Sequence, residues 1–411
     1  MDITSEKSFS ELYPRINPFS DINTATGASF ITNIPSGLIT TAPRAGPVGD
    51  IATGVMNDCI YVYETGSVCY YQILRNGIKV GNPIKLPGTE VGAIVPGQVA
   101  NMFHPVVKSG GSGWLIVASY SIGNVATSTN KGVVYWMTDA FSINFDRING
   151  VYNLSSEPNH AVRKYIFWYT FRWLVLLDTG NAGYFTINNM NANHSELVKL
   201  PTQRHMANAT TFNYILYIAY VNNSNLREIS IDRFSVNDLL NGFSLTMGLS
   251  ISPPVVGGTN TNPALAVYRN NLLCTYGGGD AYYSVAIVNR PDLPVTWSPS
   301  YRFALYTANT STLATNYDAG VTIFAYHNTR MTVAPNGNYS NICYKIFYWS
   351  TRKWSVIEYV FTAKVPTGKI SCAYGAGKWF IQLRANYIER TNGTSTTLLT
   401  VVVPFKLLRV E

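Results

Sequence analysis

The chain has 411 residues, of which 46% are hydrophobic and 13% are charged, and its formal net charge is +8. The hydrophobic share is typical of a globular protein, whereas the charged share is about half the usual value. The basic residues are scattered, and the densest clusters are the pairs Arg163-Lys164 and Arg352-Lys353. Because counterion release on nucleic acid needs a basic patch, this pattern argues against a specific nucleic-acid site and leaves an anionic partner, such as an acidic glycan, for the excess charge.

The N-terminal stretch MDITSEKSFSELYPR lacks a basic region followed by an apolar one, so no signal peptide is expected. The most apolar stretch, residues 165–177, is interrupted by Arg172, and no membrane span is expected either. Residues 1–27 are predicted to form an arm outside the folded domain. The candidate anchors for assembly in this arm are Leu12, Tyr13, Ile16 and Phe19.

Residues 28–40, ASFITNIPSGLIT, have a strand-like pattern but no partner strand next to them in the sequence. Seven similar units of strand, tight turn and strand follow. Their starts are about 40 to 60 residues apart, at Asp50, Val99, His160, His205, Asn262, Asp318 and Lys369. This period is the one expected of propeller blades.

The unit that begins at Asn262 shows the pattern most clearly. Three apolar runs are separated by Arg269-Asn270-Asn271 and by the segment GGGD at residues 277–280. No Lys and no helix follow this glycine run, so we predict a hairpin turn there rather than a phosphate-binding loop.

A fourth strand follows several units, namely NPIKLP (82–87), SINFDRI (142–148), SELVKLP (195–201), TWSPSYRFAL (296–305) and KWSVIEYVF (353–361). The one helical signal is SVNDLLNGF at residues 235–243. The sequence therefore predicts an all-β chain in which residues 28–411 form a single seven-bladed β-propeller of four-stranded antiparallel blades. A ring must close to protect its edges, so residues 28–40 are predicted to complete the last blade beside residues 401–411.

The spacing of the units and the stretch Trp354-Ser355-Val356 resemble kelch-type seven-bladed propellers, although the paired glycines of kelch repeats are missing. Residues 36–62, SGLITTAPRAGPVGDIATGVMNDCIYV, are similar to the start of the propeller tail-hub, or nozzle, proteins of short-tailed bacteriophages. This second resemblance implies a virion component that is made in the host cytoplasm.

Polar residues at the starts of the innermost strands are the candidates for a binding site at the mouth of the central channel. They are Asp50, His160, His205, Asn262, Asp318 and Lys369. The alternative interpretation is a set of ordinary loop residues. A glycosidase needs two carboxyl groups roughly 5 to 9.5 Å apart, and a whole unit separates Asp50 from Asp318, so no catalytic residue is assigned.

Neither a metal site nor a cofactor is expected, because the five histidines lack the spacing of zinc ligands. The five cysteines lie in apolar runs and are predicted to be small buried hydrophobic residues. The segments KYIFWYT (164–170) and YKIFYW (344–349) carry aromatic rings at alternating positions. These rings either pack in the core between blades, or stack on sugars and anchor a protein interface.

These patterns predict a non-enzymatic structural and interaction propeller of a virus particle, such as a phage tail hub or a receptor-binding attachment protein. Its expected partners are other virion proteins or copies of itself. Two alternatives stay open. One is a carbohydrate-binding or carbohydrate-active propeller, a lectin or a glycosidase-like protein, that contacts a cell-surface glycan. The other is a kelch-like adaptor.

Overall fold

The structure is a computed structural model. It describes residues 29–33, 49–53, 58–65, 68–75, 78–86, 100–110, 113–122, 129–138, 150–155, 161–169, 172–178, 185–190, 195–199, 205–213, 215–221, 228–239, 242–255, 263–288, 290–328, 339–362, 365–375, 377–389 and 393–410. Within these ranges every regular element is a β-strand, and every strand pair is antiparallel. The prediction of an all-β chain is confirmed.

The strands form six sheets, five of which have four strands. The first contains β2 (Gly49–Thr53), β3 (Asp58–Thr65), β4 (Val68–Arg75) and β5 (Ile78–Lys85). The second contains β6 (Ala100–Gly110), β7 (Gly113–Ile122), β8 (Thr129–Thr138) and β9 (Gly150–Ser155). The third contains β10 (Ala161–Tyr169), β11 (Arg172–Asp178), β12 (Phe185–Met190) and β13 (Ser195–Lys199). The fourth contains β14 (His205–Phe212), β15 (Ile215–Val221), β16 (Ile229–Leu239) and β17 (Gly242–Met247).

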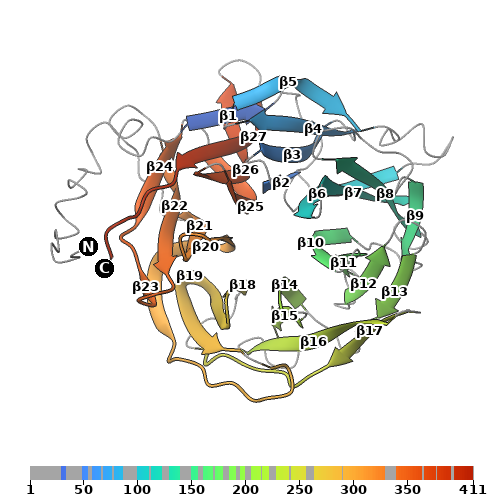
Figure 1. The fold of residues 1–411 in the computed structure, drawn as a ribbon. Helices are drawn as coiled ribbons and strands as arrows, with labels where there is room; N and C mark the ends of the chain where they lie inside the picture. The colour runs from blue at the N-terminus through green and yellow to red at the C-terminus, as the bar shows by residue number, and fades with distance from the viewer. Residues whose placement is uncertain are drawn as a thin grey trace, which may run out of the picture.

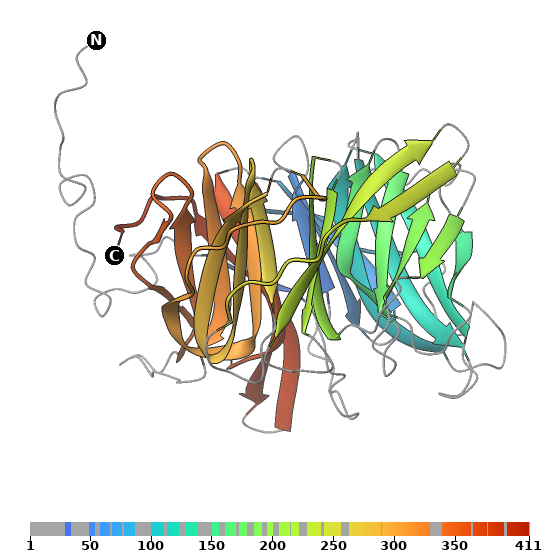
Figure 2. The same ribbon diagram turned by 90° about the horizontal axis from the view of Figure 1, so that it is seen from below.

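The fifth sheet has seven strands: β18 (Ala264–Tyr268), β19 (Asn271–Ile287), β20 (Tyr301–Asn316), β21 (Val321–Asn328), β22 (Tyr339–Tyr348), β23 (Lys353–Trp354) and β24 (Glu358–Thr362). The sixth has the order β1 (Ser29–Asn33), β27 (Gly393–Pro404), β26 (Lys378–Glu389) and β25 (Val365–Gly375). Figure 1 shows the sheets set radially around a common axis, and Figure 2 shows their tilt from the side.

Strand β19 folds back on itself. A straight strand of its 17 residues would be roughly 55 Å long, yet the amide of Val288 donates to the carbonyl of Asn270 at 2.7 Å. The turn lies at Gly277 and Gly279, whose φ angles of 141° and 95° are accessible mainly to glycine. A Cβ atom on Gly277 would also collide with the carbonyl oxygen of Asp280. The predicted glycine hairpin is therefore confirmed.

Strand β20 belongs to two groups of strands. Residues 301–307 pair with residues 279–283 of β19, whereas residues 307–316 pair with β21. The seven-stranded sheet thus divides at Thr307 into two four-membered antiparallel groups. The first group ends with the outer strand that starts near Trp297, and the second begins with the inner strand at residues 311–316.

The innermost strands of successive groups contact one another around the axis, in the order β2, β6, β10, β14, β18, β20 and β25, and β25 contacts β2. The core lies between neighbouring sheets rather than within one layer. Three apolar clusters each combine residues of two adjacent groups, such as Tyr217 with Leu272, Leu273 with Phe324, and Ile323 with Trp379. Burial on both faces explains the nearly continuous apolar runs of the second strands.

Both ends of the described chain lie against the last groups. Ser29 of β1 pairs with Val402 of β27. After β27, residues 405–410 cross to the neighbouring group, where the amide of Val356 donates to the carbonyl of Arg409 at 2.8 Å. The hydroxyl of Tyr348 donates to the carbonyl of Leu408 at 2.6 Å and accepts from the amide of the same residue at 2.7 Å.

One sequence expectation differs from the structure. The helical signal at residues 235–243 is wrong, because this stretch forms the end of β16 and the start of β17, with Val236 paired to Leu245. A segment this short cannot sustain a helix alone, and its residues pair instead in the hairpin of β16 and β17. The segment SINFDRI lies outside the described residues, and the outer strand of that sheet is β9.

Candidate functional site

The structure describes four of the six residues predicted for the channel mouth, namely Asp50, His205, Asp318 and Lys369. His205 is the first residue of the inner strand β14, as expected. Asp50 and Lys369 instead lie within the inner strands β2 and β25, because each strand starts before them, at Gly49 and Val365. His160 and Asn262 lie outside the described residues, as do Leu12, Tyr13, Ile16 and Phe19 of the predicted arm.

Asp318 does not precede an inner strand. It lies in the exposed turn after residues 311–316 of β20 and before β21, so the predicted position is wrong. The turn is fixed by the side-chain oxygen of Asn316, which accepts from the amides of Asp318 and Ala319 at 3.1 Å. The apolar run at 321–328 resembles an inner strand in sequence, but it is the second strand of its group. Asp318 therefore follows an inner strand, whereas His205 begins one.

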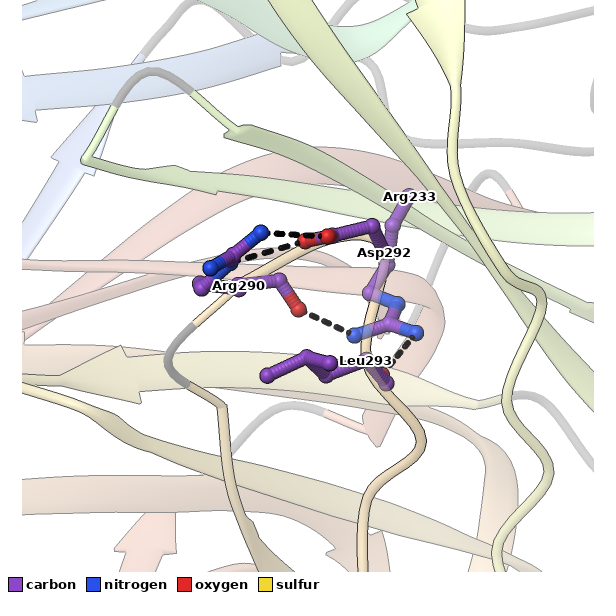
Figure 3. A network of polar contacts seen from close by, with 4 residues as sticks. All are labelled: Arg233, Arg290, Asp292 and Leu293. Carbon is purple, nitrogen blue, oxygen red and sulfur yellow. Dashed lines mark hydrogen bonds and ion pairs between the residues drawn. The ribbon is translucent and has the colours of Figure 1, made fainter.

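The best-defined surface feature of the described residues lies on the outer rim, around the fully buried side chain of Arg233 on β16. Its guanidinium donates to three backbone carbonyls: Leu249 at 2.8 Å, Arg290 at 2.8 Å and Leu293 at 2.6 Å. Figure 3 shows the last two bonds and the ion pair of Arg290 with Asp292 at 2.6 Å. Arg233 therefore fixes the loop at residues 290–293 of one sheet against the preceding sheet.

Three exposed apolar side chains belong to the two backbone segments to which Arg233 is hydrogen-bonded. We define the rim patch as Met247, Leu249 and Leu293, whose side chains are 44%, 50% and 46% exposed. Met247 and Leu249 are two apart in an extended segment and so point to the same side. Gly248 between them is required by close approach, since a Cβ atom would collide with the carbonyl oxygen of Pro291. The patch is thus apolar, and the exposed ion pair of Arg290 with Asp292 lies next to it in the sequence.

A second feature gathers aromatic rings at the turns of the seven-stranded sheet. We define the aromatic ladder as Tyr317, Tyr268 and Trp349. Tyr268 stacks against Tyr317 at 6.2 Å between ring centroids and against Trp349 at 5.6 Å. The guanidinium of Arg269 lies 5.3 Å from the centre of the Tyr268 ring. Trp349 is buried, whereas Tyr317 is 56% exposed, so the ladder presents one ring to solvent.

Most rings of the segment YKIFYW pack in the core. Tyr344 and Tyr348 face the last sheet, Phe347 faces the preceding group, and all three are buried. The core interpretation is confirmed for this segment, while the side chains of KYIFWYT lie outside the described residues. Burial raises the pKa of Tyr344 well above its usual value.

Sequence reasoning missed the rim patch and the aromatic ladder. Arg233 lies in an ordinary alternating strand, and its three acceptors are backbone carbonyls, which leave no pattern in side-chain identities. A weak signal existed at Leu249 and Leu293, since each lies next to Pro or Gly in a stretch between two predicted units or strands. The ladder joins residues 268, 317 and 349, which are brought together only by the pairing of the strands.

The described residues hold no group of three or more His, Cys, Asp and Glu side chains close enough to share a metal ion. Cys274, Cys343 and Cys372 are free and buried, as predicted for these three. Burial raises the pKa of Cys343 to about 12. Over the same part of the chain, no helix has the length and apolar composition needed to cross a bilayer.

Antiparallel sheets set radially around an axis, with the core between them, define a β-propeller. Protein-family models and curated proteins give no match to this chain. Among solved structures, the WD40 domain of coronin from Toxoplasma gondii is similar at 10% identity and a TM-score of 0.46, over 93% of this chain and 88% of that one. The WD40 domain of SCAP from fission yeast is 8% identical with a TM-score of 0.44, over 92% and 98%.

The subtype N11 neuraminidase-like protein of the A/flat-faced bat/Peru isolate is 8% identical with a TM-score of 0.40, over 91% of this chain and 93% of that one. All three TM-scores lie below 0.5, so these similarities carry no argument about activity.

Proposed function

We propose that this protein is an interaction propeller that assembles with copies of itself through its outer rim and has no catalytic role. The observation that carries the proposal is the rim patch, in which three half-exposed aliphatic side chains stand on backbone fixed by buried Arg233. Arg233 brings Leu249 and Leu293 together by bonding to both carbonyls, and apolar surface exposed in one place is typical of interaction sites. The rigid backbone of the rim patch lowers the ordering cost of association.

The proposed architecture is a closed ring of seven four-stranded blades. It is supported by the unbroken series of contacts among seven inner strands, and by the division of the seven-stranded sheet at β20. The pairing of β1 with β27 supports closure of the last blade by residues 28–40.

The assembly we propose is part of a virus particle, as a tail hub or attachment protein, with other virion proteins as further partners. Support comes from the charged share of 13%, which leaves few charges to desolvate at contacts, and from the resemblance of residues 36–62 to phage tail-hub propellers.

The test combines Leu249→Asp with Leu293→Asp and measures mass by light scattering at rising protein concentration. We expect the unmodified protein to form oligomers and the double variant to stay monomeric, with the same melting temperature. The matched control combines Val80→Asp with Ile84→Asp, because these side chains are 42% and 48% exposed on β5, at another part of the rim. The control should oligomerise normally. A protein that is monomeric throughout, or a double variant that oligomerises normally, would contradict the proposal.

A second candidate function is carbohydrate binding, and the aromatic ladder favours it. Sugars stack on exposed aromatic faces, and Tyr317 presents its ring next to exposed Asp318. The test is a glycan array probed with the protein, with Tyr317→Ala and with Tyr301→Ala. Tyr301 is the control, since it is 50% exposed outside the ladder. Binding that only Tyr317→Ala removes supports this function, and a blank array counts against it.

A further inference from the structure

A cavity of about 350 Å³ lies between the two groups of the seven-stranded sheet. One wall is the outer strand of the first group, at residues 302–305 of β20, and the other wall comes from β21, β22 and β24 of the second group. Its described lining residues are Arg302, Phe303, Ala304, Leu305, Asn328, Lys345, Ile357 and Tyr359.

The cavity is lined by two cations and, among its described lining residues, by no acid. Lys345 is only 2% exposed, and its ammonium donates to the carbonyl of Phe303 at 2.9 Å. Arg302 comes from the opposite wall and reaches solvent, with a side chain that is 60% exposed. Two cationic side chains that line one cavity favour an anionic ligand over a neutral one.

The neutral part of the lining fits an apolar body with a polar end. Phe303 stacks on Trp354 with ring centroids 4.1 Å apart and an interplanar angle of 18°, which fixes one aromatic wall. Ile357 adds aliphatic surface, and Asn328 and Tyr359 add an amide and a phenol. Small-molecule sites have this mixture of apolar walls and few polar groups, and volumes of about 300 to 1,000 Å³.

We propose that this cavity binds a small organic anion, with a carboxylate or phosphate held by Lys345 and Arg302 and an apolar body against Phe303 and Ile357. The site is independent of the rim patch and the aromatic ladder, so it stands whether or not the protein self-assembles. Asp280 competes with the ligand, because its carboxylate forms an ion pair with Arg302 at 3.3 Å.

Calorimetric titration with phenyl phosphate and with benzoate tests the proposal, and benzyl alcohol is the neutral probe. We expect saturable binding of an anion and none of the alcohol. The preferred probe tells whether the ligand carries a phosphate or a carboxylate. Arg302→Gln should weaken binding by at least about fivefold, since it removes a charged hydrogen-bond donor. Asp280→Asn should strengthen binding severalfold, because it releases Arg302.

Lys345→Met should abolish binding, with Lys353→Met as the control, because Lys353 is exposed and lies outside the cavity. Should Lys345→Met fail to fold, the exposed position of Arg302 keeps the test intact. The proposal is overturned if neither anion binds saturably to the unmodified protein, if benzyl alcohol binds as well as the anions, or if Arg302→Gln leaves anion binding unchanged.

Discussion

The guanidinium of Arg233 donates to the carbonyl oxygen of Leu293, 60 residues further along the chain, at 2.6 Å. This bond joins β16 of one sheet to a loop of the next (Figure 3). The same guanidinium also donates to the carbonyls of Leu249 and Arg290. Its burial lowers the pKa of Arg233. The charge is held by aligned dipoles rather than by a buried carboxylate, so loss of the side chain leaves three carbonyls without donors.

Arg233→Met is expected to lower the free energy of unfolding by about 3 kcal/mol or more, because buried carbonyls lose charged donors without access to water. Chemical denaturation measures the change. Arg290→Met is the control, since its ion pair with Asp292 is exposed, and its unfolding curve should match that of the unmodified protein. Equal stability of both variants would refute the role of Arg233.

Gly277→Ala is expected to destabilise the fold more than Gly279→Ala. Both positions have positive φ angles, at 141° and 95°, so both substitutions strain the backbone. Only at Gly277 would the new methyl group also collide with the backbone of Asp280, whereas the space around Gly279 is open. We expect a difference of roughly 1 to 3 kcal/mol between the two variants in thermal unfolding. A smaller effect at Gly277 would show that the hairpin turn lies elsewhere.

Tyr348→Phe is expected to lower the free energy of unfolding by about 1 to 2 kcal/mol, because both hydrogen bonds to the backbone of Leu408 are lost. Limited proteolysis should then cut the C-terminal segment faster. Tyr317→Phe is the matched control on an exposed ring and should leave both readouts unchanged. Unchanged proteolysis of Tyr348→Phe would mean that residues 405–410 are held by other contacts.

The strand pattern and the glycine turn could be read from the sequence because they depend on local chemistry. Apolar runs such as Ala264–Tyr268 and Val321–Asn328 form strands, and Gly277 and Gly279 mark the hairpin turn within β19. Whether a strand is the first or the second of its group depends on which strands it pairs with, and local chemistry does not identify these partners. Asp318 was placed at the wrong end of an inner strand because β20 continues from one group into the next without a break.

The candidate sites needed the structure for a different reason. The acceptors of Arg233 are backbone carbonyls, and the cavity joins Arg302 to Lys345 across two groups of strands. Neither arrangement requires particular residue types at a fixed spacing in the sequence, so no sequence motif predicts it. The channel-mouth residues remain a prediction as a binding site, since His205, Asp50 and Lys369 are described only by their backbone.

His327 makes stability depend on pH. Burial lowers its pKa to about 4, whereas an unfolded histidine titrates near about 6.5. Between about pH 6.5 and pH 4, the imidazole of His327 is protonated in the unfolded chain but not in the folded chain. This residue therefore lowers the free energy of unfolding as the pH falls, by roughly 3 kcal/mol at most. Burial raises the pKa of Glu358, which acts in the opposite direction over part of this range.

The measurement is therefore the difference between the unmodified protein and His327→Leu in denaturant unfolding from pH 7 to pH 4. The variant should lose less stability as the pH falls. Parallel stability curves for the two proteins would contradict the lowered pKa of His327.

The last prediction concerns closure of the ring by β1. Strand β1 covers the outer edge of β27 by pairing Ser29–Asn33 with Leu398–Val402. Without β1, the backbone groups of β27 on that side have no partner, and an unpaired strand edge recruits strands from other molecules. Deletion of residues 1–40 should therefore give a protein that aggregates and melts at a lower temperature. Deletion of residues 1–27 is the control, because it removes the predicted arm and keeps β1. Light scattering and thermal unfolding of the two truncated proteins separate the effects. If the larger deletion has the same mass in light scattering and the same melting temperature as the control deletion, β1 does not close the ring.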